Sequence, residues 1–216
     1  MIVAIDGGVA SGKSAAGRRV AEALDLTFVD SGLMYRAITR LAADRGIDPH
    51  DADAMTRLAE SADLRIDGER VWADGVELTS GIYDADHADA LPIVSAIPGV
   101  RGALVGQQRK LGDRGVVMAG RDIGTVVFPD AAHKFFLVAG PEEKVRRRAA
   151  QFERRGERVD TEAMRKEVEE RDRVDSQRAV APLRAAPDAT VIDTDHLDVD
   201  QVVDIILRKV RDTEQK

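Results

Sequence analysis

The sequence predicts an α/β fold in which a parallel sheet is flanked by helices, with a small inserted antiparallel β meander and a helical lid. Short apolar segments typical of buried strands alternate with longer helical segments, which indicates a parallel sheet covered by helices. A glycine-rich run joins the first strand to the first helix, and three short alternating segments interrupt the rhythm farther along. The 216 residues, of which 44% are apolar, suffice for one domain of ordinary size.

The first predicted strand (2–5) and the first predicted helix (15–24) are joined by the run Gly-Gly-Val-Ala-Ser-Gly-Lys-Ser. This run fits the phosphate-loop pattern G-x-x-x-x-G-K-[ST]. A loop that opens a helix offers unpaired backbone N–H groups and the positive end of the helix dipole, which suits a nucleoside triphosphate. We expect Lys13 to reach the β- and γ-phosphates and the Ser14 hydroxyl to hold Mg²⁺. The alternative is a plain glycine-rich turn with a solvated lysine. The predicted donor-binding residues are Gly7, Gly8, Val9, Ala10, Ser11, Gly12, Lys13, Ser14 and Ala15.

The rest of the α/β core follows from apolar composition and helical periodicity. The strand 27–30 is expected beside the phosphate loop, at the carboxyl end of the sheet where open α/β folds bind ligands. The remaining predicted elements are the strands 115–119, 134–138 and 190–193 and the helices 34–45 and 199–211.

Two regions depart from the α/β rhythm. The short alternating runs 64–67, 70–73 and 76–79 are separated by turn residues, among them an Asp-Gly pair, and predict an antiparallel meander inserted into the core. Its single Trp72 is interpreted as a packing residue. The stretch 140–160 is helical, highly charged and interrupted by a glycine, which is typical of a mobile flap.

Composition narrows the classes of function. The net charge is −7, from 32 basic and 39 acidic side chains, so a general basic field for binding nucleic acid is missing. The chain has no cysteine, which excludes disulfides and thiolate metal sites and favours the cytoplasm. We expect no membrane partner and no secretion signal. Any affinity for phosphate must come from local arginines, which are concentrated at 146–158 and 165–178.

A first polar patch, at 30–36, follows a predicted strand. Phosphoryl transfer needs a second pocket for an acceptor, and here Ser31 and Arg36 could hold an acceptor phosphate while Tyr35 packs on a sugar. The alternative is that Ser31 caps a helix and Arg36 is a surface residue. Asp30 could contribute to binding Mg²⁺.

Two more patches lie at 120–127 and 171–178. Arg121 could pair with a phosphate, and Asp122 could accept from a base amino group or from a magnesium-bound water. In the second patch helical spacing would place Arg171, Asp175 and Arg178 on one face. The alternatives are a surface ion pair and a solvated stripe of charge.

Taken together, the motifs resemble those of bacterial cytidylate kinases over essentially the whole chain. They are the phosphate loop, D-S-G-x-x-Y-R at 30–36, P-x-V-R at 98–101, G-R-D-I-G-T-V-V-F-P at 120–129 and R-D-x-x-D-x-x-R-A-V-A-P-L at 171–183, with V-I-D-T near the C-terminus. The resemblance implies transfer of the γ-phosphate of ATP to CMP or dCMP, with Mg²⁺, by a monomer. It also implies a P-loop kinase domain spanning 1–216, with a core (about 1–60, 99–140 and 179–216), an acceptor-binding insert (about 61–98) and a lid (about 141–178).

The resemblance also assigns roles to residues of this chain. It implies that Arg101 and Asp122 face cytosine, and that Arg171 and Asp175 reach the ribose. Lys13, Arg121 and Arg178 are the expected catalytic residues. The resemblance places Ser31, Arg36 and Arg121 on the CMP phosphate with Tyr35 beside it, and Arg178 on the phosphates.

Some positions differ from the family pattern or stay open. Ala15 and Ala119 stand where many relatives have a threonine and an acid, and Pro92 stands where relatives often have a serine that contacts the base. Ser95, one turn later, could substitute for that serine. The sequence does not select a lid arginine to close over the phosphates from Arg148, Arg154 and Arg158.

Two alternative functions share the donor site. The chain could be a phosphate-loop kinase of another small acceptor, such as UMP or shikimate. In that case Arg101, Asp122 and the face at 171–178 would have no shared ligand. A nucleotide-dependent switch or binding protein would need a second magnesium-binding strand, for which Asp30 and Asp122 are the only candidates the motifs offer.

Overall fold

The computed structural model describes residues 1–83, 89–154, 156 and 159–214. Five parallel strands form the central sheet in the order β2-β6-β1-β7-β8. All five predicted core strands are present. The strand 27–30, β2, was expected beside the phosphate loop, but β6 lies between β2 and β1, the strand that leads into the loop. The bounds are β1 (Ile2–Gly7), β2 (Thr27–Asp30), β6 (Val116–Gly120), β7 (His133–Val138) and β8 (Thr190–Asp193).

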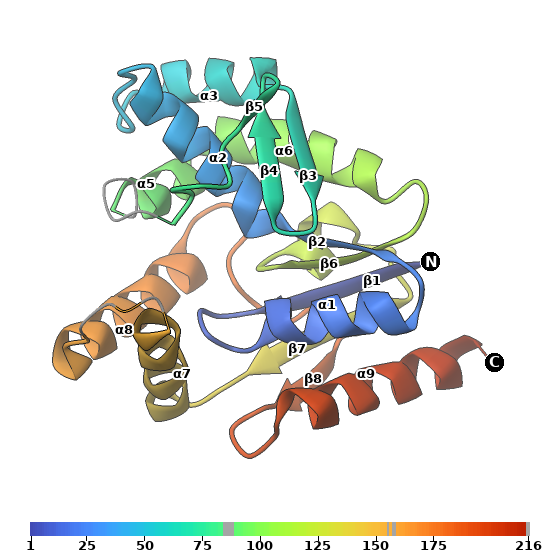
Figure 1. The fold of residues 1–216 in the computed structure, drawn as a ribbon. Helices are drawn as coiled ribbons and strands as arrows, with labels where there is room; N and C mark the ends of the chain where they lie inside the picture. The colour runs from blue at the N-terminus through green and yellow to red at the C-terminus, as the bar shows by residue number, and fades with distance from the viewer. Residues whose placement is uncertain (84–88, 155, 157–158, 215–216) are drawn as a thin grey trace.

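One face of the sheet is covered by α1 (Lys13–Ala23) and α9 (Val199–Glu214), which lie side by side in Figure 1. Val3 and Ile5 of β1 are fully buried against this layer, together with Val20 of α1 and Ile206 of α9. Alternate β1 residues face opposite sides, so Ala4 packs into the second core on the other face. The sheet is therefore buried on both sides, as its apolar strands predict.

The opposite face carries a helical layer and the small sheet. Here α2 (Ser31–Asp44) begins three residues earlier than its periodicity predicts, because Asp30 caps it by accepting a hydrogen bond from the Gly32 N–H at 3.0 Å. The remaining elements of this layer are α3 (Ala52–Ser61), α5 (Ala90–Ala96), α6 (Pro98–Leu111) and the antiparallel strands β3 (Leu64–Asp67), β4 (Arg70–Ala73) and β5 (Val76–Glu77).

The inserted meander shares its core with the helices around it. Val71 and Ala73 of β4 are buried with residues of α2, α3, α5 and α6 in one apolar cluster. Trp72, on the other face of β4, is half-buried between the guanidinium groups of Arg65 and Arg70, each 4.7 Å from its ring centre. The packing role predicted for Trp72 agrees with this position.

Two helices stand apart from the rest in Figure 1, at the end of the sheet where α1 begins. They are α7 (Pro141–Glu153) and α8 (Thr161–Gln177), and they contact each other through Val145, Met164 and Val168. Val9 of the phosphate loop packs against this small cluster. Of the helices in the described part of the chain, none is long and apolar enough to span a membrane.

Candidate active site

The loop between β1 and α1 has the geometry of a phosphate cradle. Gly7 must lack a side chain, because a Cβ there would lie 2.6 Å from the Leu137 carbonyl oxygen. Gly12, immediately before α1, adopts a left-handed conformation (φ 88°) that glycine tolerates without strain. Lys13 is buried, and its Nζ donates to the Gly8 carbonyl at 2.9 Å. Burial and the nearby Arg121 lower the pKa of Lys13 to about 8.

The Ser14 hydroxyl donates to Asp30 Oδ2 at 2.7 Å, so two of the three predicted magnesium-binding residues lie together. Asp30 also caps α2 through its other oxygen, which makes the alternative cap by Ser31 wrong. Within the described residues, no group of three or more His, Cys, Asp or Glu side chains could hold a metal alone. A hydroxyl and a single carboxylate fit Mg²⁺, which keeps several waters and is usually completed by substrate phosphates.

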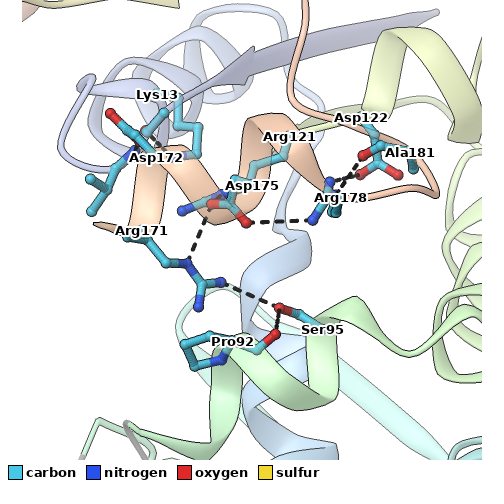
Figure 2. A network of polar contacts seen from close by, with 12 residues as sticks. Lys13, Pro92, Ser95, Arg121, Asp122, Arg171, Asp172, Asp175, Arg178 and Ala181 are labelled. Atoms are coloured by element: carbon cyan, nitrogen blue, oxygen red, sulfur yellow. Dashed lines mark hydrogen bonds and ion pairs between the residues drawn. The ribbon is translucent and has the colours of Figure 1, made fainter. Parts of the chain in front are cut away.

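The second and third sequence patches meet around one buried carboxylate. Asp175 of α8 is 1% exposed and pairs with Arg121, which follows β6. Its oxygens also lie 3.3 Å from Arg171 Nε and 3.5 Å from Arg178 Nη1. Figure 2 shows these side chains gathered at one end of α8. The predicted helical face is confirmed, although Arg178 itself caps α8 rather than belonging to it.

Positive charge exceeds negative charge in this cluster. Burial lowers the pKa of Arg171 to about 10, and Arg121 and Arg36 act in the same direction against the opposing effect of Asp175. Arg178 Nη2 is buried and finds no hydrogen-bond partner among the described residues. Such a group of guanidiniums favours an added anion, because an anion would satisfy both the charge and the open donor.

Ser31 and Arg36 lie at the same end of the sheet. The Ser31 hydroxyl lies close to the G-R-D motif, since a Cβ on Gly120 would lie 2.6 Å from it. Arg36 is half-buried, with its guanidinium carbon 4.7 Å from the ring centre of Tyr83. Arg148 of α7 contributes to a lowered pKa of Arg36, behind the larger effect of burial.

Arg101 and Asp122 form a buried ion pair at the other side of the site. The ring of Tyr35 lies beneath Arg101, with its centre 5.2 Å from the guanidinium carbon, and burial raises the pKa of Tyr35 to about 12. Tyr35 is therefore placed to support Arg101. Asp122 Oδ1 is also 4.0 Å from Arg178 Nη2, which links this pair to the guanidinium cluster.

Ser95 lies where it could replace the serine that many relatives have at the position of Pro92. Its carbonyl accepts from Arg101 at 3.0 Å, and its hydroxyl lies 3.4 Å from Arg171 Nη2 and donates to the Pro92 carbonyl at 3.2 Å. Figure 2 shows Ser95 and Pro92 on the same turn, facing Arg171. Ser95 thus contacts the site from the position that the sequence analysis suggested.

The remaining departures from the family pattern are more remote or buried. Ala15 is exposed on the first turn of α1, and Ala119 is fully buried in β6. Among the lid arginines, Arg148 is the one that affects Arg36, while Arg154 is exposed at the end of α7. Arg158 lies outside the described residues.

Two residues that contact the G-R-D and V-I-D-T motifs or belong to them were not predicted from the sequence to be part of the site. Asp6, the residue before the loop, accepts from the Ile123 and Gly124 N–H groups at 2.8 and 2.7 Å. Burial raises its pKa to about 7, against the opposing effect of these two N–H groups. Thr194 accepts from Arg147 of α7 at 2.9 Å and donates toward the Val138 carbonyl at 2.9 Å.

Asp172 and Lys144 were not predicted either; in the lid, Lys144 Nζ donates to Asp172 Oδ2 at 2.6 Å. Asp172 is part of the R-D-x-x-D motif quoted from the sequence, so the signal was present. Helical spacing predicts a functional face shared by Arg171 and Asp175, and Asp172 lies on a different face of the helix.

Comparison with known proteins places these motifs in a family. A model of the family described as cytidylate kinase matches residues 3–212. A cytidylate kinase of Mycobacterium avium (strain 104) is 44% identical over 217 residues, which cover 98% of this chain and 95% of that protein. A bifunctional pantoate ligase/cytidylate kinase of Synechococcus sp. (strain JA-3-3Ab) is 46% identical over 218 residues, covering 97% of this chain. The chain spans 40% of the length of that bifunctional relative.

Solved structures agree on the fold. The shikimate kinase from Acinetobacter baumannii, in complex with shikimate, superposes with a TM-score of 0.50 at 15% identity. The match covers 100% of this chain and 95% of that one. At this identity the likeness shows the fold alone, a parallel sheet with flanking helices, as the sequence predicts.

Proposed function

The chain belongs to the cytidylate kinase family, and on that premise we propose that it transfers the γ-phosphate of ATP to CMP or dCMP, giving ADP and CDP or dCDP. The observation that carries this proposal is the convergence of two buried clusters opposite the phosphate loop. One is the guanidinium group around Asp175, which suits a phosphate. The other is the Arg101–Asp122 pair, which suits a base with both acceptors and a donor.

The acceptor nucleotide would bind across both clusters. Its phosphate would contact Arg36, Arg121 and Ser31, with Arg178 adding its open Nη2 donor. Cytosine offers acceptors at O2 and N3 and a donor at N4, so a guanidinium and a carboxylate complement it. Uracil reverses this pattern at N3 and O4, which would leave the buried pair unsatisfied.

The ribose would lie beside Arg171 and Asp175 on α8. A carboxylate that accepts from sugar hydroxyls tolerates a deoxyribose with some loss, because one hydrogen bond disappears while the rest remain. This tolerance supports use of dCMP as a second acceptor.

The chemistry requires positioning and neutralisation of charge rather than covalent participation by the protein. Lys13 would hold the transferring phosphate against the loop N–H groups, and Arg121 and Arg178 would neutralise the charge that develops between donor and acceptor. Ser14, and Asp30 through water, would hold Mg²⁺, which supplies positive charge to the phosphate oxygens when it is bound. Asp122 is buried in its pair with Arg101 and fits a magnesium-bound water less well.

The working parts of the molecule would be a core (about 1–60, 99–140 and 179–216), an acceptor-binding insert (about 61–98) and a lid (about 141–178). The small apolar cluster between α7 and α8 supports a lid that moves as one piece. We place the enzyme in the cytoplasm as a monomer, with free nucleotides rather than nucleic acid as partners. The net charge of −7 supports only the absence of nucleic acid among these partners, because a negative protein repels polyphosphate chains.

Turnover with CMP, UMP, AMP and shikimate, followed as release of ADP, tests the proposal. We expect kcat/KM for CMP to exceed that for UMP by about 100-fold or more, because the mismatched base leaves buried polar groups unpaired. Equal values for CMP and UMP would contradict the cytosine assignment. The family match does not favour a kinase of another acceptor or a nucleotide switch, and ATP loss that needs no acceptor would reopen the second alternative.

A further inference from the structure

Asp172 of the lid lies on the phosphate loop rather than in the acceptor pocket. Figure 2 shows it beside Lys13, whereas its neighbour Arg171 points toward Ser95. Asp172 Oδ1 accepts from the Val9 N–H at 3.1 Å. The contact is possible because Gly8 has no side chain, since a Cβ there would lie 2.8 Å from the same oxygen.

The second oxygen of Asp172 binds a cation from the other lid helix. Lys144 Nζ lies 2.6 Å from Oδ2, and the two side chains are 17% and 22% exposed. Val9 also packs its side chain against the apolar cluster between α7 and α8. Among the described residues, the lid therefore contacts Val9 of the phosphate loop in two ways, through a polar contact at its N–H and an apolar contact at its side chain.

A carboxylate at this place acts as an anion on an anion-binding loop. The N–H groups of the loop and the positive end of α1 attract negative charge, and Asp172 accepts from one of these N–H groups as a phosphate oxygen would. The terminal phosphate of a donor would be repelled by this carboxylate, and the Val9 N–H has only one hydrogen to donate.

Space exists for an exchange of partners. Gly8, Lys144 and Asp172 line a cavity of about 440 Å³, together with Ser176 and Arg184. The carboxylate can swing away from Val9 into this cavity without unfolding α8, since a rotation of its side chain is enough.

We propose that Asp172 is the resident anion of the empty phosphate loop, and that the terminal phosphate of the donor replaces it at the Val9 N–H and takes over Lys144. Lys144 is then a donor-binding residue that is paired with Asp172 until the donor binds. The inference rests on the proposed function only in taking ATP as the donor. It adds a means by which the lid distinguishes a triphosphate from a diphosphate.

The test is equilibrium binding of ADP and of the non-hydrolysable ATP analogue AMP-PNP, each with Mg²⁺ and without CMP, by calorimetry. Asp172→Asn keeps the shape but removes the charge, so the Kd for AMP-PNP is expected to fall by about 3- to 10-fold. Lys144→Met removes the cation, so the Kd for AMP-PNP is expected to rise by about the same factor. Binding of ADP is expected to change by less than about twofold in both variants, because ADP lacks the competing phosphate.

Glu169→Gln and Lys166→Met are matched controls, because both residues are exposed on α8 and the charge changes are the same. Both controls are expected to bind like the wild type, and circular dichroism checks that every variant is folded. In the wild type, the Val9 amide resonance is expected to shift more with AMP-PNP than with ADP, and in Asp172→Asn to differ before any nucleotide is added.

Weaker binding of AMP-PNP by Asp172→Asn would overturn the proposal, because it would mean that the carboxylate stays in the donor complex, for example on the metal ion. Equal effects on ADP and AMP-PNP, or none, would also overturn it and leave Asp172 as a structural contact of the lid. Turnover of CMP is measured separately. If the protein phosphorylates CMP but the variants do not show the expected binding pattern, this inference alone is refuted. If the variants show the pattern but the protein does not phosphorylate CMP, the proposed function alone is refuted.

Discussion

Many residues of the site are charged groups that are partly shielded from solvent, so neighbouring charges strongly affect their pKa values and their pairing. Lys13 is desolvated beside Arg121, while the Arg101–Asp122 pair is buried with each charge balanced by the other. Buried charges of this kind are costly to leave unpaired. Single substitutions in the site should therefore affect one substrate at a time, according to which charge they remove.

Binding of the donor is expected to weaken as pH rises through the pKa of Lys13, about 8 in the empty enzyme. Above that pH Lys13 loses its proton and its charge, so the Kd for AMP-PNP should rise by about tenfold between pH 7 and pH 9. Lys13→Arg should flatten this dependence, because a guanidinium stays charged. Calorimetry at a series of pH values measures both, and a wild-type curve as flat as that of the arginine variant would contradict the prediction.

Asp122→Asn is expected to impair use of CMP far more than binding of ATP. The substitution leaves Arg101 as a buried cation without its partner, so kcat/KM for CMP should fall by about 100-fold or more while the Kd for AMP-PNP changes by less than about threefold. Steady-state kinetics and calorimetry give the two values. Asp113→Asn, at an exposed position, is the control, and equal damage to both substrates would refute a role at the base.

At the scale of elements, periodicity predicted the sheet well and the helices of the second layer poorly. Strands β2, β3, β4 and β8 have the predicted bounds, because short apolar runs between turn residues are unambiguous. Helix α6 was not predicted, since three interior glycines mask its periodicity. One of them, Gly99, is required by packing against α3, because a Cβ there would lie 2.2 Å from Thr56 Oγ1.

The turn after the G-R-D motif gives another example. Ile123–Val127 is rich in β-branched residues, which favour a strand, yet it forms a π-helical turn. Asp6 stabilises this turn by accepting its first two N–H groups, so a tertiary contact overrides local preference. No pattern in the sequence pairs residue 6 with residues more than a hundred positions away.

Asp6→Ala is expected to lower the free energy of unfolding by about 2–4 kcal/mol, because two buried N–H groups lose their acceptor. The pKa of Asp6 in the native state, about 7, lies above its unfolded value of 3.8, so the native protein binds the extra proton between these pH values. The contribution of Asp6 to the stability of the wild type therefore decreases as pH rises from 4 to 7, and the effect of the substitution should shrink over the same range.

Urea unfolding of the wild type and Asp6→Ala at pH 5 and pH 8 measures this difference. The exposed Asp113→Ala serves as the control and is expected to leave the free energy of unfolding within about 0.5 kcal/mol of the wild-type value. A larger loss for Asp6→Ala at pH 8 than at pH 5 would contradict the assignment.

At the scale of the whole molecule, the core part of the site is built from the carboxyl ends of strands in the central sheet. The phosphate loop, Asp30 and the G-R-D motif all lie at the carboxyl ends of parallel strands, which meet at one edge of the sheet, so their proximity could be predicted. The contributions of the lid could be predicted only in part. Helical spacing gives the face shared by Arg171 and Asp175, but only the three-dimensional packing of α7 against α8 brings Lys144 to Asp172.

CMP alone is expected to stabilise the whole molecule, because it would bridge residues from the core, the insert and the lid. At 100 times its Kd, a ligand adds about 2.7 kcal/mol to the free energy of unfolding, which corresponds to an increase in Tm of about 5–10 °C for a chain of this length. Scanning calorimetry measures the shift, and UMP at the same concentration should give less than half of it. An equal shift with UMP would contradict recognition of cytosine.

The carboxylate of Asp175 has a consequence for the sequence of events in a reaction cycle. It draws guanidiniums from two parts of the chain together before any nucleotide arrives. Neither substrate must therefore assemble the receiving pocket for the other, and we expect a random order of addition, with intersecting initial-rate plots when both concentrations are varied.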